Sequence, residues 1–154
     1  MSGWTEGIPW VIAALGWGAT HVFSEARERR KEVRAQLDKV LERLAEIEES
    51  AREFHAGQTF DQKKSRSLLS EISRVERSLD RIKRFKLDDF TPVIIAHRRA
   101  VTYKNFDSGS FSTCELDSEL LADISFATHE FEDEIERQYG RSYPSKFPYF
   151  KLFS

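Results

Sequence analysis

The side chains in this sequence that could do chemistry are few and far apart. His129 and Asp133 have the i, i+4 spacing of two metal ligands on one helix face. A closed zinc site takes about four ligands, so an acidic helix in solvent explains the pair better. Cys114 precedes Glu115, whose charge disfavours the thiolate that a nucleophilic cysteine needs. The remaining histidines stand alone in the sequence: His21, His55 and His97.

The short motifs of phosphate-loop, dinucleotide-binding, zinc-protease and serine-hydrolase sites do not occur in the sequence. We therefore predict no enzymatic activity, no metal and no cofactor. The remaining candidate for ligand binding is an anion site at His97, Arg98 and Arg99, although paired arginines are also common on solvated helix faces. A net charge of −2 over 154 residues predicts no nucleic-acid partner.

One apolar segment, residues 8–23, contains no charged residue. As a helix it covers about 24 Å, and counting from Trp4 extends it to about 30 Å, the thickness of a hydrocarbon core. Tryptophan suits the lipid–water interface. We expect a membrane-spanning anchor with four aromatic members: Trp4, Trp10, Trp17 and Phe23. A buried helix, a helix lying on the membrane and a cleaved signal peptide are the alternatives, but the segment has no polar face and no basic residue precedes it.

The residues after the anchor indicate its direction. Five basic side chains follow it closely: Arg27, Arg29, Arg30, Lys31 and Arg34. Because basic residues favour the inner side, we expect residues 1–7 outside and the C-terminus in the cytoplasm of a bacterial inner membrane, with anionic lipid near the basic run. A single cysteine agrees with that reducing compartment. Within the anchor, Ala14 and Gly18 have the spacing of a helix–helix contact.

Two long helices are expected to follow one another. Apolar residues recur at steps of three and four over residues 33–54 and again over 68–82, the spacing of a heptad seam: Val33, Leu37, Val40, Leu44, Ile47, Ala51 and Phe54, then Leu68, Ile72, Val75, Leu79 and Ile82. We predict one helix from residue 8 to about 56 and a second over 60–86. Their short connection favours an antiparallel hairpin, although an intermolecular coiled coil has the same pattern.

Two shorter helices, near 92–104 and 117–139, should complete a bundle of three or four helices over residues 24–140. We expect N-caps at Thr59, Thr91 and Asp117, and helix ends at Gly57 and Gly140. Residues 141–154 form an aromatic-rich tail, predicted to be extended. The chain is therefore predicted to be all-α, with a transmembrane helix that continues into a long antiparallel hairpin or coiled coil.

Charge is distributed unevenly between two of these helices. Residues 61–86 hold nine basic and four acidic side chains, whereas residues 115–136 hold nine acidic and no basic ones. We expect the two helices to pack side by side, so that their flanks attract one another. The alternative is that one of them is a docking surface for a charged partner.

The order of anchor, basic junction and long cytoplasmic helix resembles the b subunit of bacterial ATP synthase, which continues as one helix where Gly57, Pro92 and Gly140 interrupt this chain. It also resembles phage inner-membrane spanins, which face the periplasm. The basic run over residues 27–34 also resembles that of uncharacterised small bacterial single-pass membrane proteins with a helical cytoplasmic domain. These resemblances imply a layout and transfer no activity.

The sequence therefore predicts a membrane-anchored cytoplasmic helical module for interaction or scaffolding. Its expected partners are membrane lipid and either another protein or a second copy of the chain. The alternative is a membrane-active effector or small pore subunit in phage defence or stress response, whose anchors oligomerise.

Overall fold

The computed structural model describes residues 8–85, 87–103, 105–115 and 117–144, and of the side chains at 8–23 only those of Trp17 and His21. Every element in the described residues is helical: α1 (Ile8–His55), α2 (Gln62–Ile82), the short 3-10 helix η1 (Lys83–Phe85), α3 (Thr91–Thr102) and α4 (Glu119–Ser142). The all-α prediction is confirmed. The chain divides into two compact units, Met1–Ala35 and Gln36–Ser154.

The first unit contains the beginning of α1. Trp17 is 74% exposed and stacks on His21, with 5.6 Å between the ring centroids. Trp4 lies outside the described residues, as do the side chains of Trp10, Ala14, Gly18 and Phe23. Within the part of the chain that is described, no helix combines the length and the apolar character needed to cross a membrane.

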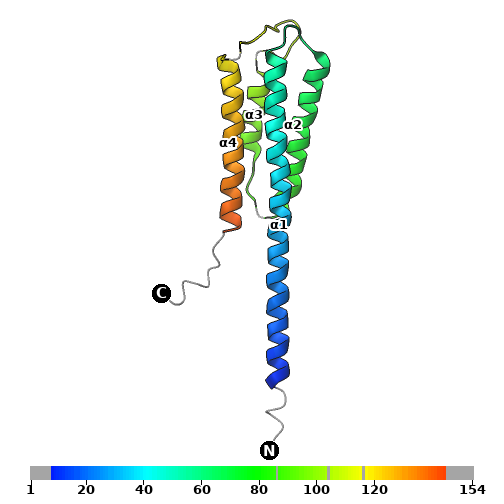
Figure 1. Ribbon diagram of the computed structural model, residues 1–154, viewed down its shortest axis with the longest axis vertical. Coiled ribbons are helices and arrows are strands. Elements are labelled where there is room, and N and C mark those ends of the chain that lie inside the picture. The colour runs from blue at the N-terminus through cyan, green and yellow to red at the C-terminus, as the bar shows by residue number, and fades with distance from the viewer. Residues whose placement is uncertain (1–7, 86, 104, 116, 145–154) are drawn as a thin grey trace, which may run out of the picture. The chain divides into compact units, whose positions relative to one another are not determined.

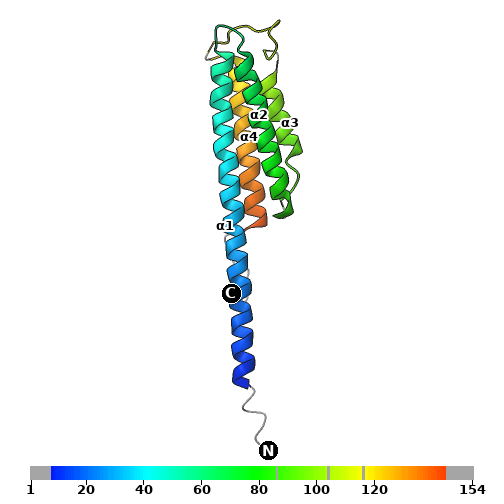
Figure 2. The same cartoon turned by 90° about the vertical axis from the view of Figure 1, so that its right-hand side faces the viewer.

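The second unit is a bundle of four helices: the rest of α1, α2, α3 and α4 (Figures 1 and 2). Arg43 of α1 donates a hydrogen bond to Ser78 of α2, and Arg98 of α3 pairs with Glu76 of α2. Ser125 of α4 donates to Glu48 of α1. The ring of His97 of α3 lies against that of Phe131 of α4. Each helix therefore has two neighbours, and α2 and α4 lie at diagonal corners of the bundle.

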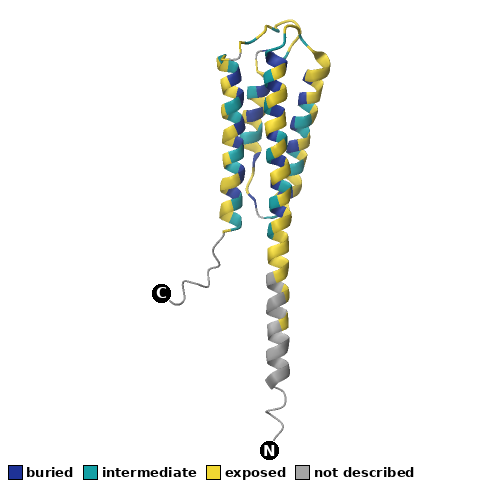
Figure 3. Ribbon diagram, in the orientation of Figure 1, coloured by how far each residue is buried: buried dark blue, intermediate teal, exposed yellow. Residues whose placement is uncertain are grey.

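The predicted seams form the centre of the core (Figure 3). The six seam positions of α1 from Leu37 to Phe54 and all five of α2 are buried in this unit, and the first seam residue, Val33 of the first unit, is buried as well. Residues of α3 and α4 close the core from the other side: Val101, Leu121, Ile124, Phe131 and Ile135. Burying a side chain such as Leu44 or Leu79 contributes about 1.5–3 kcal/mol, so these stripes provide the main drive for assembly of the bundle.

The helix ends differ from the sequence prediction. Asp61, and not Thr59, caps α2, because its carboxylate accepts hydrogen bonds from the backbone amides of Lys63 and Lys64. Thr91 is the first residue of α3 and its amide and hydroxyl donate to Asp89, so it is not the N-cap.

The ends of α4 differ in the same way. Its N-cap is Ser118 and not Asp117. Gly140 does not end the helix, which continues to Ser142 and so includes the first two residues assigned to the extended tail. A glycine near the end of a helix favours termination, but its backbone is also compatible with helical geometry.

Candidate functional site

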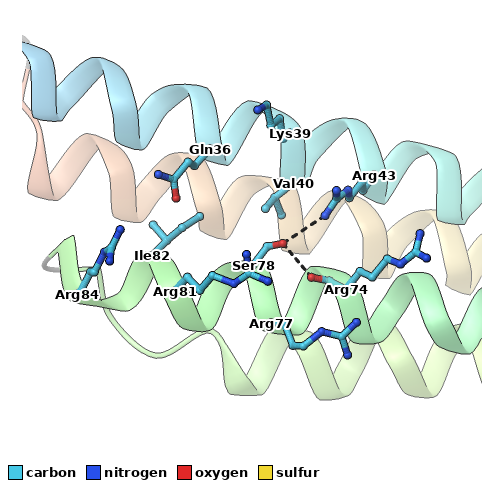
Figure 4. A pocket seen from close by; sticks show the side chains of 10 residues that line it. All are labelled: Gln36, Lys39, Val40, Arg43, Arg74, Arg77, Ser78, Arg81, Ile82 and Arg84. Carbon is cyan, nitrogen blue, oxygen red and sulfur yellow. Dashed lines mark hydrogen bonds between the residues drawn. The ribbon is translucent and has the colours of Figure 1, made fainter.

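A cationic groove runs between α1 and α2 in the second unit (Figure 4). Its volume is about 470 Å³. Six of its ten lining residues are basic: Lys39, Arg43, Arg74, Arg77, Arg81 and Arg84. The other four are Gln36, Val40, Ser78 and Ile82, so the described lining contains no carboxylate.

The groove follows from positions beside the two apolar seams. On α2 the arginines recur at steps of three and four, at Arg74, Arg77 and Arg81, and Arg84 on η1 continues the series. This spacing places side chains along one stripe of a helix. On α1, Lys39 and Arg43 flank the seam residue Val40. Val40 and Ile82 are almost completely buried at the base of the groove.

Few of these cations are neutralised within the molecule. Arg74 pairs with Glu71 at 2.7 Å, and Arg43 donates to the hydroxyl of Ser78 at 3.2 Å. Ser78 in turn donates to the carbonyl of Arg74, which fixes the hydroxyl between the two arginines. Lys39, Arg77 and Arg81 have no ion-pair partner among the described residues. Holding such charges together without a counter-charge is unfavourable, so the groove is suited to an anionic ligand.

The shape of the groove favours an extended anionic surface over a single phosphate. Phosphate sites commonly use the backbone amides of a helix N-terminus, whereas this groove is lined by mid-helix residues and by the C-terminal end of α2. Arg81 in the last turn also has a purely structural role, because cations stabilise the negative end of a helix dipole. That role does not extend to Arg74 and Arg77, which lie further from the end, or to the cations of α1.

The opposite charge is concentrated on α4. Its solvent-facing stripe holds Glu119, Asp123, Glu130 and Asp133, all exposed, with Phe126 between them at 67% exposure. The prediction that the basic helix and this acidic helix pack side by side is wrong. The connection through α3 places α2 and α4 at diagonal corners, and in the view of Figure 1 they lie on opposite sides of α1.

The structure does not bring together the predicted anion site. His97 points into the core and is 1% exposed, next to the ring of Phe131. Arg98 pairs with Glu76 at 3.1 Å, and Arg99 lies over the ring of Tyr103 at 5.7 Å. Consecutive helical residues point about 100° apart, which separates the three side chains.

His97 is the most perturbed titratable group in the bundle. Burial lowers the pKa of His97 to about 4, and the negative charge of Glu48 opposes that shift only in part. Its Nε2 has no hydrogen-bond partner among the described residues. His97 is therefore a neutral core side chain at pH 7 and not an anion ligand.

A buried polar network that the sequence did not reveal closes the end of the bundle. Nε2 of His55 donates to the carbonyl of Val101 at 2.9 Å, which leaves Nδ1 to accept from the amide of Asn105. Asn105 also donates to the carbonyl of Ser112 and accepts from its backbone amide, both at 2.7 Å. The amide of Cys114 donates to the carbonyl of His55 at 2.9 Å.

The environment of this network gives it a structural role. His55 is completely buried, and burial lowers the pKa of His55 although the bond to Val101 acts in the opposite direction. Aromatic rings surround Phe54 beside it: Phe60, Phe106 and Phe111. The network fastens the loop after α3 to the end of α1.

The remaining predicted residues are not among those that line the groove. Arg27, Arg29 and Lys31 are exposed, Arg30 and Arg34 are half-buried, and Lys31 pairs with Glu28 at 3.1 Å. His129 pairs with Glu132 on the surface of α4. Nowhere in the described residues do three or more metal-ligating side chains come together.

Fold and groove together define an all-α, helical-bundle protein with one cationic face and one acidic face. The chain matches no protein-family model, and neither the curated proteins nor the solved structures contain a significant match to it.

Proposed function

We propose that this protein is a helical interaction module that binds an acidic protein surface in the groove between α1 and α2. The observation that carries the proposal is the set of six cations around one groove without a lining carboxylate. An acidic partner would neutralise Lys39, Arg77 and Arg81, which have no counter-charge among the described residues. Such contacts contribute mainly to partner choice and association rate.

We further propose that residues 8–23 anchor the module in a bacterial inner membrane, with the C-terminus in the cytoplasm. The support is in the sequence: the segment has no charged residue, and the basic run over 27–34 follows it directly. Membrane lipid would be its partner there. Carbonate extraction of membranes from cells that express the full chain tests the anchor, because a spanning helix stays in the pellet. Recovery of all the protein in the soluble fraction would overturn it.

The pairing of α1 with α2 is proposed to be an antiparallel coiled-coil hairpin within one chain. Its support is the burial of both seams and the bonds across the pair, from Arg43 to Ser78 and from Lys64 to Glu53. Exchange of the hairpin between two chains would bury the same seams. A cross-link between cysteines placed at 43 and 78, in a Cys114→Ser background, should form within a single chain, and an intermolecular product alone would contradict the hairpin.

Binding in the groove is tested with a defined acidic polymer. Fluorescent polyglutamate should bind the full chain in a non-ionic detergent, and binding should weaken as salt screens the charges. Arg77→Glu with Arg81→Glu should weaken binding by at least about tenfold. The matched control is Lys63→Glu with Arg66→Glu, which makes the same charge change on exposed residues of α2 outside the groove.

Two results would overturn the proposed binding. One is equal loss of binding in the control variant, which would indicate a response to net charge alone. The other is tight, groove-dependent binding to phosphatidylglycerol vesicles without binding to polyglutamate, which would make the groove a lipid site. The competing hypothesis of an oligomerising effector predicts instead that Gly18→Leu abolishes assembly, because it blocks close approach in the membrane.

A further inference from the structure

We infer that the acidic surface that fits the groove is α4 of a second copy of this chain. The inference rests on the proposed function, since it identifies the partner of the same groove. It starts from the two diagonal corners of the bundle, which carry opposite and largely unneutralised charge.

The acidic stripe of α4 has four carboxylates without an ion-pair partner among the described residues: Glu119, Asp123, Glu130 and Asp133. Together with Phe126, these carboxylates form a series along α4 in which successive members are four and three residues apart. The arginines of the groove recur at the same steps along α2 and η1. Because the charged side chains of both helices have the same spacing, acidic and basic residues can face one another along the length of the two helices, as charged flanks do in coiled coils.

The exposed ring of the acidic stripe also suits the walls of the groove. Phe126 is 67% exposed in the middle of the acidic stripe, an unfavourable position for a large aromatic ring in the monomer. Val40 and Ile82 are almost completely buried at the base of the groove, so its accessible walls are formed mainly by the basic side chains. A ring that enters there would lie against guanidinium groups, a favourable arrangement for an aromatic anchor.

Geometry decides the type of assembly. Because α2 and α4 lie at diagonal corners, one neighbour cannot fill the groove and cover α4 of the same molecule at once. The contact is therefore heterologous, with α4 of one copy in the groove of the next. A net charge of only −2 opposes such association weakly.

Sedimentation velocity of the full chain in a non-ionic detergent tests the inference. At an ionic strength of about 0.05 M the protein should sediment as oligomers, and at about 0.5 M it should dissociate to monomers, because screening shortens the reach of the charges. Arg77→Glu with Arg81→Glu should abolish assembly, as should Glu130→Arg with Asp133→Arg. An equimolar mixture of these two variants should form a 1:1 complex, because one intact groove then meets one intact α4.

The controls separate this contact from other causes. Lys63→Glu with Arg66→Glu should assemble like the natural chain, and Phe126→Ala should weaken assembly by about tenfold. The inference is overturned if no oligomer forms at low salt, or if Gly18→Leu alone abolishes assembly. If polyglutamate still binds in the groove while the chain stays monomeric, then α4 of a second copy is not the partner, and the proposed function stands. If polyglutamate does not bind, the proposed function itself fails.

Discussion

The side-chain amide of Asn105 donates a hydrogen bond to Nδ1 of His55 across 3.3 Å, although the two residues are 50 positions apart in the sequence. The same amide holds Ser112 on the far side of the loop. One buried side chain that has all its polar atoms in use therefore helps to attach the loop after α3 to the end of α1, beside the backbone bond from Cys114 to His55.

Replacement of Asn105 should destabilise the bundle through that attachment. Asn105→Ala leaves Nδ1 of the buried His55 ring and the backbone amide of Ser112 without these partners, and the loss at the buried ring accounts for most of an expected cost of about 2 kcal/mol in the free energy of unfolding. Urea denaturation followed by circular dichroism measures it. Gln58→Ala, an exposed change in the neighbouring turn, should alter stability by less than about 0.5 kcal/mol. Equal stability of the two variants would mean that the network contributes nothing.

The stability of the bundle should fall in mild acid because of His97. The pKa of His97 is about 4 in the folded chain and 6.5 in its unperturbed state, so the unfolded chain binds a proton first. Stability is therefore fully present above pH 6.5 and is lost as the pH falls towards 4, by up to about 3 kcal/mol. Unfolding midpoints between pH 7 and pH 4 measure the loss.

His97→Leu isolates this effect from that of the other titratable groups. Because Nε2 of His97 has no partner, an apolar side chain of similar size should leave stability at pH 7 equal or higher. The acid-dependent loss should become smaller than in the natural chain. An unchanged pH profile would assign the loss to other groups, such as His55.

The start of α2 allows a direct comparison between Asp61, which caps the helix, and Thr59, which does not. Asp61→Ala removes two hydrogen bonds to backbone amides and should cost about 1 kcal/mol. Thr59→Ala should be close to neutral, because Thr59 is exposed and does not cap the helix. Thermal unfolding of both variants tests this assignment. A larger loss of stability for Thr59→Ala than for Asp61→Ala would show that Thr59 is the N-cap, as the sequence predicts.

Two glycines should respond to alanine in opposite directions. A Cβ at Gly140 meets no described atom within 4 Å, and the residue is helical, so Gly140→Ala should raise stability by about 0.5–1 kcal/mol. A Cβ at Gly57 would lie 3.1 Å from the carbonyl oxygen of Phe54, so Gly57→Ala should be destabilising. Calorimetry of the two variants measures the sign, and a stabilising Gly57→Ala would show that the turn relaxes at little cost.

The helices and their buried stripes could be predicted because a repeat of three and four residues is a local property of the sequence. Leu44 and Leu79 needed no knowledge of their neighbours to be assigned to the core. The caps were harder, since Thr59 and Asp61 both suit a helix start and only the backbone geometry selects between them. The groove was not predictable as a unit, because Lys39 and Arg43 join the arginines of α2 only after the two helices pack.

The diagonal placement of the α2 and α4 corners makes the bundle an electric dipole directed across its width. An external field from a charged surface exerts a torque on such a body, and that torque acts over about 10 Å at moderate salt. An anionic surface would turn the Arg77 side towards itself and the Asp133 side away before any side chain touched it. The orientation of the molecule is therefore selected during approach, and a partner meets a surface that is already presented to it.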